Sequence, residues 1–125
     1  MKYLSLIAIS LFLFNACDTN ENDYSSIQPF GAAKIESISI SGNQVNVTTV
    51  YGTPTPCWYF YRNEITNDGN VFSSKVYGKD DGDVCVQMTG SFPREEKILF
   101  PTNGVKTLRF WQNDSTYLDT TITIQ

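Results

Sequence analysis

The chain has 125 residues, 9 of them basic and 13 acidic, and a formal net charge of −4 at pH 7. This acidic balance argues against a nucleic-acid partner, because phosphates attract a basic surface. The sequence has no histidine, which removes the commonest general base, the usual serine and cysteine triads and most zinc sites. We therefore expect no enzyme activity and no cofactor.

The first 17 residues have the pattern of an export signal. Lys2 precedes an apolar run from Leu4 to Phe14, which is too short to span a membrane core that needs about 20 residues. Ala16, a small residue, then precedes Cys17. This pattern predicts a signal peptide, residues 1–16, that is removed from the mature chain.

Residues 13–17, Leu-Phe-Asn-Ala-Cys, resemble the lipobox of bacterial lipoproteins, although Phe14 stands where Leu is preferred. The resemblance implies that Cys17 carries a diacylglycerol on its sulfur and a third acyl chain on its amine, which would anchor the protein in the outer membrane of a Gram-negative cell. Simple secretion after cleavage at Ala16 is the alternative. It fits less well, because secretory cleavage favours a small residue at the position of Phe14.

We expect residues 17–33 to form a flexible acidic tether, because the stretch from Asp18 to Ser26 has few apolar side chains to bury. An acidic segment just after the lipidated cysteine resembles the surface-export signals of some Gram-negative lipoproteins. A solvated linker that leaves the domain in the periplasm is the alternative. The sequence therefore does not decide between the periplasmic side and the cell surface.

Three cysteines would leave one unpaired thiol in an oxidising compartment unless one is consumed. Lipidation consumes Cys17, which leaves Cys57 and Cys85 to form a disulfide. That bond closes a loop of 29 residues and would stabilise the fold by about 3.6 kcal/mol in the chain-entropy model. Two reduced cysteines are the alternative and would suit a cytosolic protein.

Residues 34–125 alternate short β-rich runs with turn residues and show no sustained helical period. This pattern predicts one all-β domain, an antiparallel β-sandwich of seven or eight strands of immunoglobulin-like or fibronectin-like type, with a small β-barrel as the alternative. Cys57 and Trp58 are adjacent in one strand, which departs from the immunoglobulin pattern. The expected strands are 34–41, 44–51, 57–62, 71–77, 84–89, 97–100, 105–112 and 117–124, with turns at 42–43, 67–70, 78–83, around Pro93, at 101–104 and at 113–115.

The alternation of side chains along each strand predicts which ones face the core. Val45, Val47 and Tyr51 share one face, and Leu108 with Phe110 share another. In the expected strand 84–89, an apolar face of Val84, Val86 and Met88 would leave Cys85 on the wetter side. If Cys57 shares that side, Tyr59 and Tyr61 accompany it, and Trp58 and Phe60 fill the core.

The same alternation turns Tyr59, Tyr61, Arg109 and Trp111 outward, and they would form one patch if their strands are neighbours. Aromatic rings with an arginine suit either a glycan or a protein ligand. The alternative is that these side chains only stabilise the sheet through cross-strand pairs. We therefore expect a non-catalytic binding module for a protein or glycan.

Two further functions remain open: a hydrolase inhibitor that inserts loops 52–56 and 90–96 into a cleft, and a structural subunit of an envelope complex. The carboxylates that a glycosidase could use are Glu64, Asp68, Glu95 and Glu96, but they fall on predicted turns. Asp80, Asp81 and Asp83 are residues of the type that binds calcium ions. Their spacing does not match an EF-hand, so we expect a solvated turn and no metal.

Overall fold

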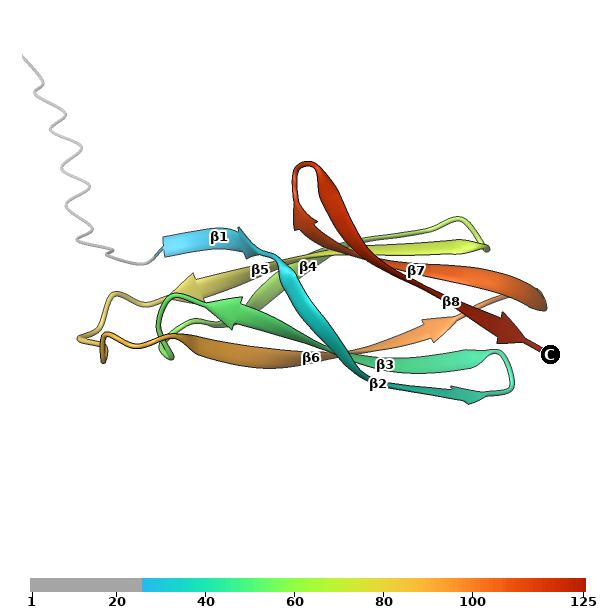
Figure 1. The fold of residues 1–125 in the computed structure, drawn as a ribbon, viewed down its shortest axis with the longest axis horizontal. Coiled ribbons are helices and arrows are strands. Elements are labelled where there is room, and N and C mark those ends of the chain that lie inside the picture. The colour runs from blue at the N-terminus through green and yellow to red at the C-terminus, as the bar shows by residue number, and fades with distance from the viewer. Residues whose placement is uncertain (1–25) are drawn as a thin grey trace, which may run out of the picture.

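A computed structural model describes residues 26–125 as two packed β-sheets (Figure 1). The predicted export signal, Cys17 and the predicted tether as far as residue 25 lie outside the described residues. The strands are β1 (Ser26–Phe30), β2 (Ala32–Ser41), β3 (Gln44–Thr53), β4 (Tyr59–Asn67), β5 (Val71–Asp80), β6 (Gly90–Leu99), β7 (Gly104–Asn113) and β8 (Thr116–Ile124).

The predicted all-β sandwich is confirmed. Sheet A contains β4, β5, β7 and β8 in that order, with β1 paired to the end of β5, and sheet B contains β2, β3 and β6. The barrel alternative is wrong, because the strands pair in two separate sheets. All pairings are antiparallel except that of β5 with β7, which are parallel where Val71–Ser74 face Thr107–Phe110. The chain crosses through β6 in the other sheet between these two strands.

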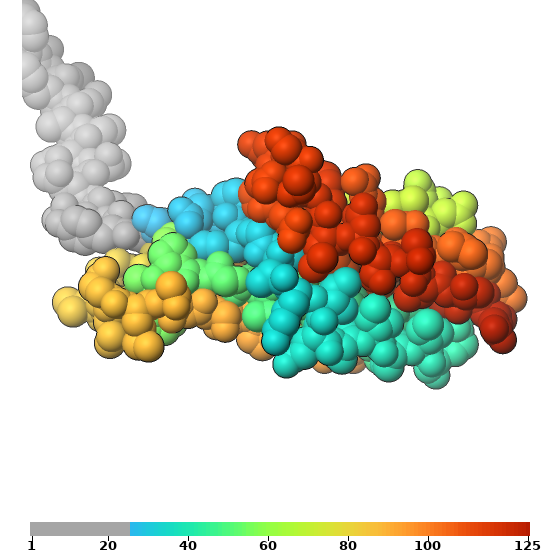
Figure 2. All heavy atoms as spheres, viewed as in Figure 1, coloured from blue at the N-terminus to red at the C-terminus, as the bar shows by residue number. Residues whose placement is uncertain are grey.

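Local sequence explains the two clearest hairpins. Gly42 has a φ of 59°, the left-handed conformation that favours glycine, and it joins β2 to β3 where the Gly-Asn pair predicted a turn. The turn predicted at residues 113–115 joins β7 to β8, and the end of this hairpin projects from the body of the molecule (Figure 2).

The ordered domain starts earlier than residue 34. Ser26–Phe30 pair with residues 76–80 of β5, and Phe30 and Ala32 are buried in the core. The burial of the Phe30 ring and the pairing of β1 with β5 hold this segment in the domain, which the polar composition did not indicate. Residues 26–33 therefore belong to the domain and not to the tether.

Two predictions for the middle of the chain are wrong. Residues 84–89 form no strand, and the side chains of Val84, Val86 and Met88 are 104%, 66% and 59% exposed instead of lining the core. Pro93 lies inside β6 rather than in a turn. Proline is tolerated there because β6 is an edge strand that pairs only with β3.

The core lies between the sheets and is rich in aromatic side chains. Val45, Val47 and Tyr51 face it from β3, and Leu108 and Phe110 face it from β7, as their alternation predicted. Trp58 and Phe60 pack against this core, as expected, and the Trp58 ring meets the Phe30 ring edge to face at 5.0 Å.

Candidate functional site

The outer surface of sheet A carries the densest set of aromatic and charged side chains. These residues point away from the core because they alternate with buried ones along β5 and β7. We call this surface the aromatic face. It comprises Tyr59, Tyr61, Arg62, Glu64, Lys75, Tyr77, Lys79, Arg109, Trp111, Tyr117 and Asp119.

The four predicted binding residues lie on this face but are not immediate neighbours. Tyr59 and Tyr61 belong to β4, whereas Arg109 and Trp111 belong to β7, and β5 lies between the two strands. Tyr59 and Tyr61 are 41% and 46% exposed. Tyr61 is the extra residue of a β-bulge, since Phe60 and Arg62 face consecutive residues of β5.

Sequence reasoning missed the central strand of the face. Lys75, Tyr77 and Lys79 of β5 lie beside β4. On the other side of β5, Lys75 reaches Trp111 of β7, whereas Tyr77 and Lys79 lie opposite residues of β1. Their i, i+2 spacing within a predicted strand was the available signal, because such residues share one side. The order of the strands was needed to place them beside the predicted residues.

Cations cover the rings on this face. The Arg62 guanidinium lies 3.9 Å from the centre of the Tyr77 ring, and the Lys75 ammonium lies 4.7 Å from that of Trp111. Between β7 and β8, the Arg109 guanidinium lies 4.3 Å from the centre of the Tyr117 ring. These cation–π contacts join neighbouring strands and hold the rings in fixed positions.

Carboxylates complete the network. Glu64 accepts a hydrogen bond from Arg62 at 3.2 Å and another from the Tyr77 hydroxyl at 3.1 Å, and these bonds lower the pKa of Glu64 below its usual value. Asp119 accepts a hydrogen bond from Arg109 at 3.1 Å. Each arginine is thus paired with a carboxylate, whereas Lys75 and Lys79 add positive charge, so the face is polar and carries more cations than carboxylates.

At the start of β4, the Tyr59 hydroxyl donates a hydrogen bond to Asp81 at 2.8 Å, which raises the pKa of Tyr59. Lys79 lies 3.9 Å from the same carboxylate. Asp81 thus joins the aromatic face to the loop of residues 81–89.

The outer surface of sheet B is different. The residues that alternate with its buried positions are mainly polar, and none is aromatic in the described strands. They include Ser37, Ser39, Asn46, Thr48, Glu95 and Lys97. The concentration of aromatic rings on one outer surface is therefore a property of sheet A and not of the sandwich as a whole.

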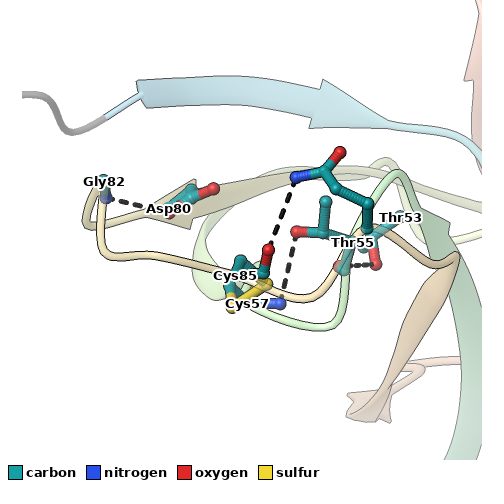
Figure 3. The surroundings of a disulfide bond; sticks show 7 residues. Thr53, Thr55, Cys57, Asp80, Gly82 and Cys85 are labelled. Carbon is teal, nitrogen blue, oxygen red and sulfur yellow. Dashed lines mark hydrogen bonds between the residues drawn. A yellow bond between two sulfur atoms is a disulfide. The ribbon is translucent and has the colours of Figure 1, made fainter.

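The predicted disulfide is confirmed. Cys57 and Cys85 are joined, with their Cα atoms 6.1 Å apart, and the bond connects the segment before β4 to the loop after β5 (Figure 3). The loop is held further by hydrogen bonds from the Gly82 amide to Asp80 and from the Gln87 side chain to the Cys85 carbonyl. Residues 90–96, which the inhibitor hypothesis treated as a loop, lie in β6.

Residues 26–125 contain no pocket, and no three of their cysteine and carboxylate side chains are grouped so that they could hold a metal ion. No helix in this part of the chain is long and apolar enough to cross a membrane. Glu96, one of the carboxylates considered for catalysis, is buried and accepts hydrogen bonds from Asn63 at 2.6 Å and Arg94 at 3.2 Å.

No family model, curated protein or solved structure matches this chain.

Proposed function

We propose that this chain is a non-catalytic binding module, anchored through lipidated Cys17 to the outer membrane of a Gram-negative cell, and that its aromatic face binds a protein partner. The observation that carries the proposal is the contrast between the two outer surfaces. Cross-strand stabilisation alone does not require five aromatic rings on one of them, because sheet B is built with mainly polar residues on its outer side.

A protein fits this face better than a glycan. A sugar ring stacks on an open aromatic face, whereas the rings of Tyr77, Trp111 and Tyr117 each have a cation within 5 Å of their centres. A protein surface can instead cover ring edges and guanidinium groups together, and protein interfaces are enriched in tyrosine, tryptophan and arginine.

The proposed anchor gives the domain an orientation. Eight residues lie between Cys17 and Ser26, so the two positions are at most about 30 Å apart when the chain is fully extended. Ser26 pairs with Asp80, which directly precedes the 81–89 loop. The end that holds the disulfide and the exposed Val84, Val86 and Met88 would then be nearest the membrane.

Comparative capture tests the binding proposal. Purified wild-type protein, Trp111→Ala and the matched sheet B control Lys97→Ala would each be immobilised and incubated with envelope extract of the parent cell. We expect one protein to be retained by the wild type and the control and lost with Trp111→Ala. Equal retention by all three would place the binding surface elsewhere, and a glycan-array signal lost with the same variant would assign the face to a glycan.

The anchor is tested separately, by intact-mass measurement of the native protein. We expect a chain that begins at Cys17 and carries the mass of three acyl chains and a glycerol. An unmodified chain would remove the membrane anchor from the proposal and leave the binding face to be judged by the capture experiment.

A further inference from the structure

The two sheets end in five edge strands within the described residues: β1, β4 and β8 in sheet A, and β2 and β6 in sheet B. A free edge exposes backbone amide and carbonyl groups that can pair with another strand, and natural proteins usually block it with short strands, bulges, prolines or charges. Four of these edges carry such features. β1, for example, has only five residues and contains Pro29.

The pairing of β2 contains two register shifts, one after Ala32 and one after Ile35. β4 contains the bulge at Tyr61 and the charged pair Arg62 and Glu64. β6 contains Pro93 and a run of four charged residues from 94 to 97.

β8 has none of these features. Its nine residues, Thr116–Ile124, contain no proline, glycine or basic residue. The register shift in the β7–β8 hairpin falls between Trp111 and Asn113, so the extra residue belongs to β7. The single charge of β8, on Asp119, is paired with Arg109. Within the part of the chain that the structure describes, β8 is thus the edge best suited to accept another strand.

We propose that β8 pairs antiparallel with β8 of a second copy, around a two-fold axis at its midpoint, Thr120. The side chains that this pairing brings together suit a second copy. With Thr120 opposite its own equivalent, Leu118 lies opposite the partner's Ile122, and both belong to the partly buried residues at the margin of the core. Asp119 lies opposite the partner's Thr121, so no like charges are directly opposite each other, and the two Asp119 carboxylates, which are diagonal neighbours, are each paired with Arg109 of their own copy.

This arrangement pairs all nine residues of β8 and keeps core-facing side chains on one side of the joined sheet, as strand alternation requires. The interface is isologous and closed, so it stops at a dimer. The aromatic faces of the two copies would lie side by side on the other side of that sheet. This dimer depends neither on the proposed anchor nor on the proposed partner.

Cysteine cross-linking in whole cells that produce the full chain tests the dimer. Directly opposite residues of an antiparallel pair have Cα atoms about 4.5–5.5 Å apart, which a disulfide can bridge. Under mild oxidation we expect Thr120→Cys to give about tenfold more covalent dimer than Ser39→Cys, an exposed control on the edge strand β2. Peptide mapping should find the two copies linked through the introduced thiols.

A second substitution tests whether the cross-link requires the proposed contact. Adding Leu118→Lys to Thr120→Cys would place a lysine against the partner's Ile122 and should abolish the cross-link. A urea unfolding transition like that of the wild type would show that each variant is folded. Equal cross-linking of folded Thr120→Cys and Ser39→Cys, or cross-linking that survives Leu118→Lys, would overturn the proposal.

Discussion

Gly31 packs directly against the backbone of Gln112, so that a Cβ atom at Gly31 would overlap the Gln112 carbonyl oxygen and lie 3.1 Å from its carbon. The Gln112 side chain, in turn, donates a hydrogen bond to the Ala32 carbonyl at 2.9 Å. This contact fixes the point where the chain passes from β1 in sheet A to β2 in sheet B.

Gly31→Ala should therefore lower the free energy of unfolding by about 2 kcal/mol, because either β1 or β7 must shift. Gly52→Ala is the matched control, since a Cβ there meets nothing within 4 Å, and it should change stability by less than about 0.5 kcal/mol. Urea unfolding compares the two variants. Equal effects would show that the crossover tolerates a side chain.

Lys106 should stabilise the end of the sandwich opposite the disulfide. It is 1% exposed, and its ammonium donates to the Gly69 carbonyl, the Asn70 side chain and the Thr102 hydroxyl at 2.7–2.9 Å. Lys106→Met would leave these acceptors without their donor and should cost about 2–3 kcal/mol in urea unfolding. The exposed control Lys97→Met should cost less than about 0.5 kcal/mol. A small effect at Lys106 would mean that water replaces the ammonium.

The disulfide should contribute a large part of the stability. Replacing both Cys57 and Cys85 with serine opens a loop of 29 residues and should lower the free energy of unfolding by about 3.6 kcal/mol. Urea unfolding of the wild type with and without a reductant gives the same comparison without mutation. A loss below about 1 kcal/mol would indicate that the unfolded chain is already restricted in this region.

Asp68 should make the fold sensitive to acid. Its carboxylate accepts hydrogen bonds from the backbone amides of Asn70 and Val71, which lower the pKa of Asp68 below its ordinary value of 3.8. A carboxyl whose pKa is lower in the folded state stabilises the fold above its unfolded pKa, and this contribution is lost as pH falls through the folded pKa.

Asp68→Asn should accordingly be less stable than the wild type at neutral pH, and the difference should shrink as pH falls below 3.8. Thermal unfolding of both proteins over a pH series measures it. A difference that stays constant down to the lowest pH would contradict a role for the ionised carboxylate.

Several parts of the fold could be predicted because they depend on local pattern. The Gly42 turn and the alternation of Val45, Val47 and Tyr51 specified the β2–β3 hairpin and its buried face. The segment 84–89 was misassigned because its Val-Cys-Val-Gln-Met alternation is the same as that of a strand. The disulfide joins it instead to the segment before β4, and no strand among the described residues pairs with it.

The parallel pairing of β5 with β7 could not be predicted, because it depends on β6 crossing into the other sheet. For the same reason, the outward direction of Tyr59, Tyr61, Arg109 and Trp111 followed from strand alternation, whereas the position of Lys75, Tyr77 and Lys79 beside them did not. Side-chain direction is local, but strand order is not.

Site-specific photo-crosslinking in the parent cell tests the binding face most directly. A photoreactive phenylalanine analogue would replace Tyr61 or Tyr117, which are 46% and 40% exposed on the aromatic face, or Thr48 on the outer surface of sheet B. We expect the first two positions to give the same protein adduct and Thr48 to give none. Adducts from Thr48 alone, or none from either aromatic position, would contradict a protein-binding role for this face.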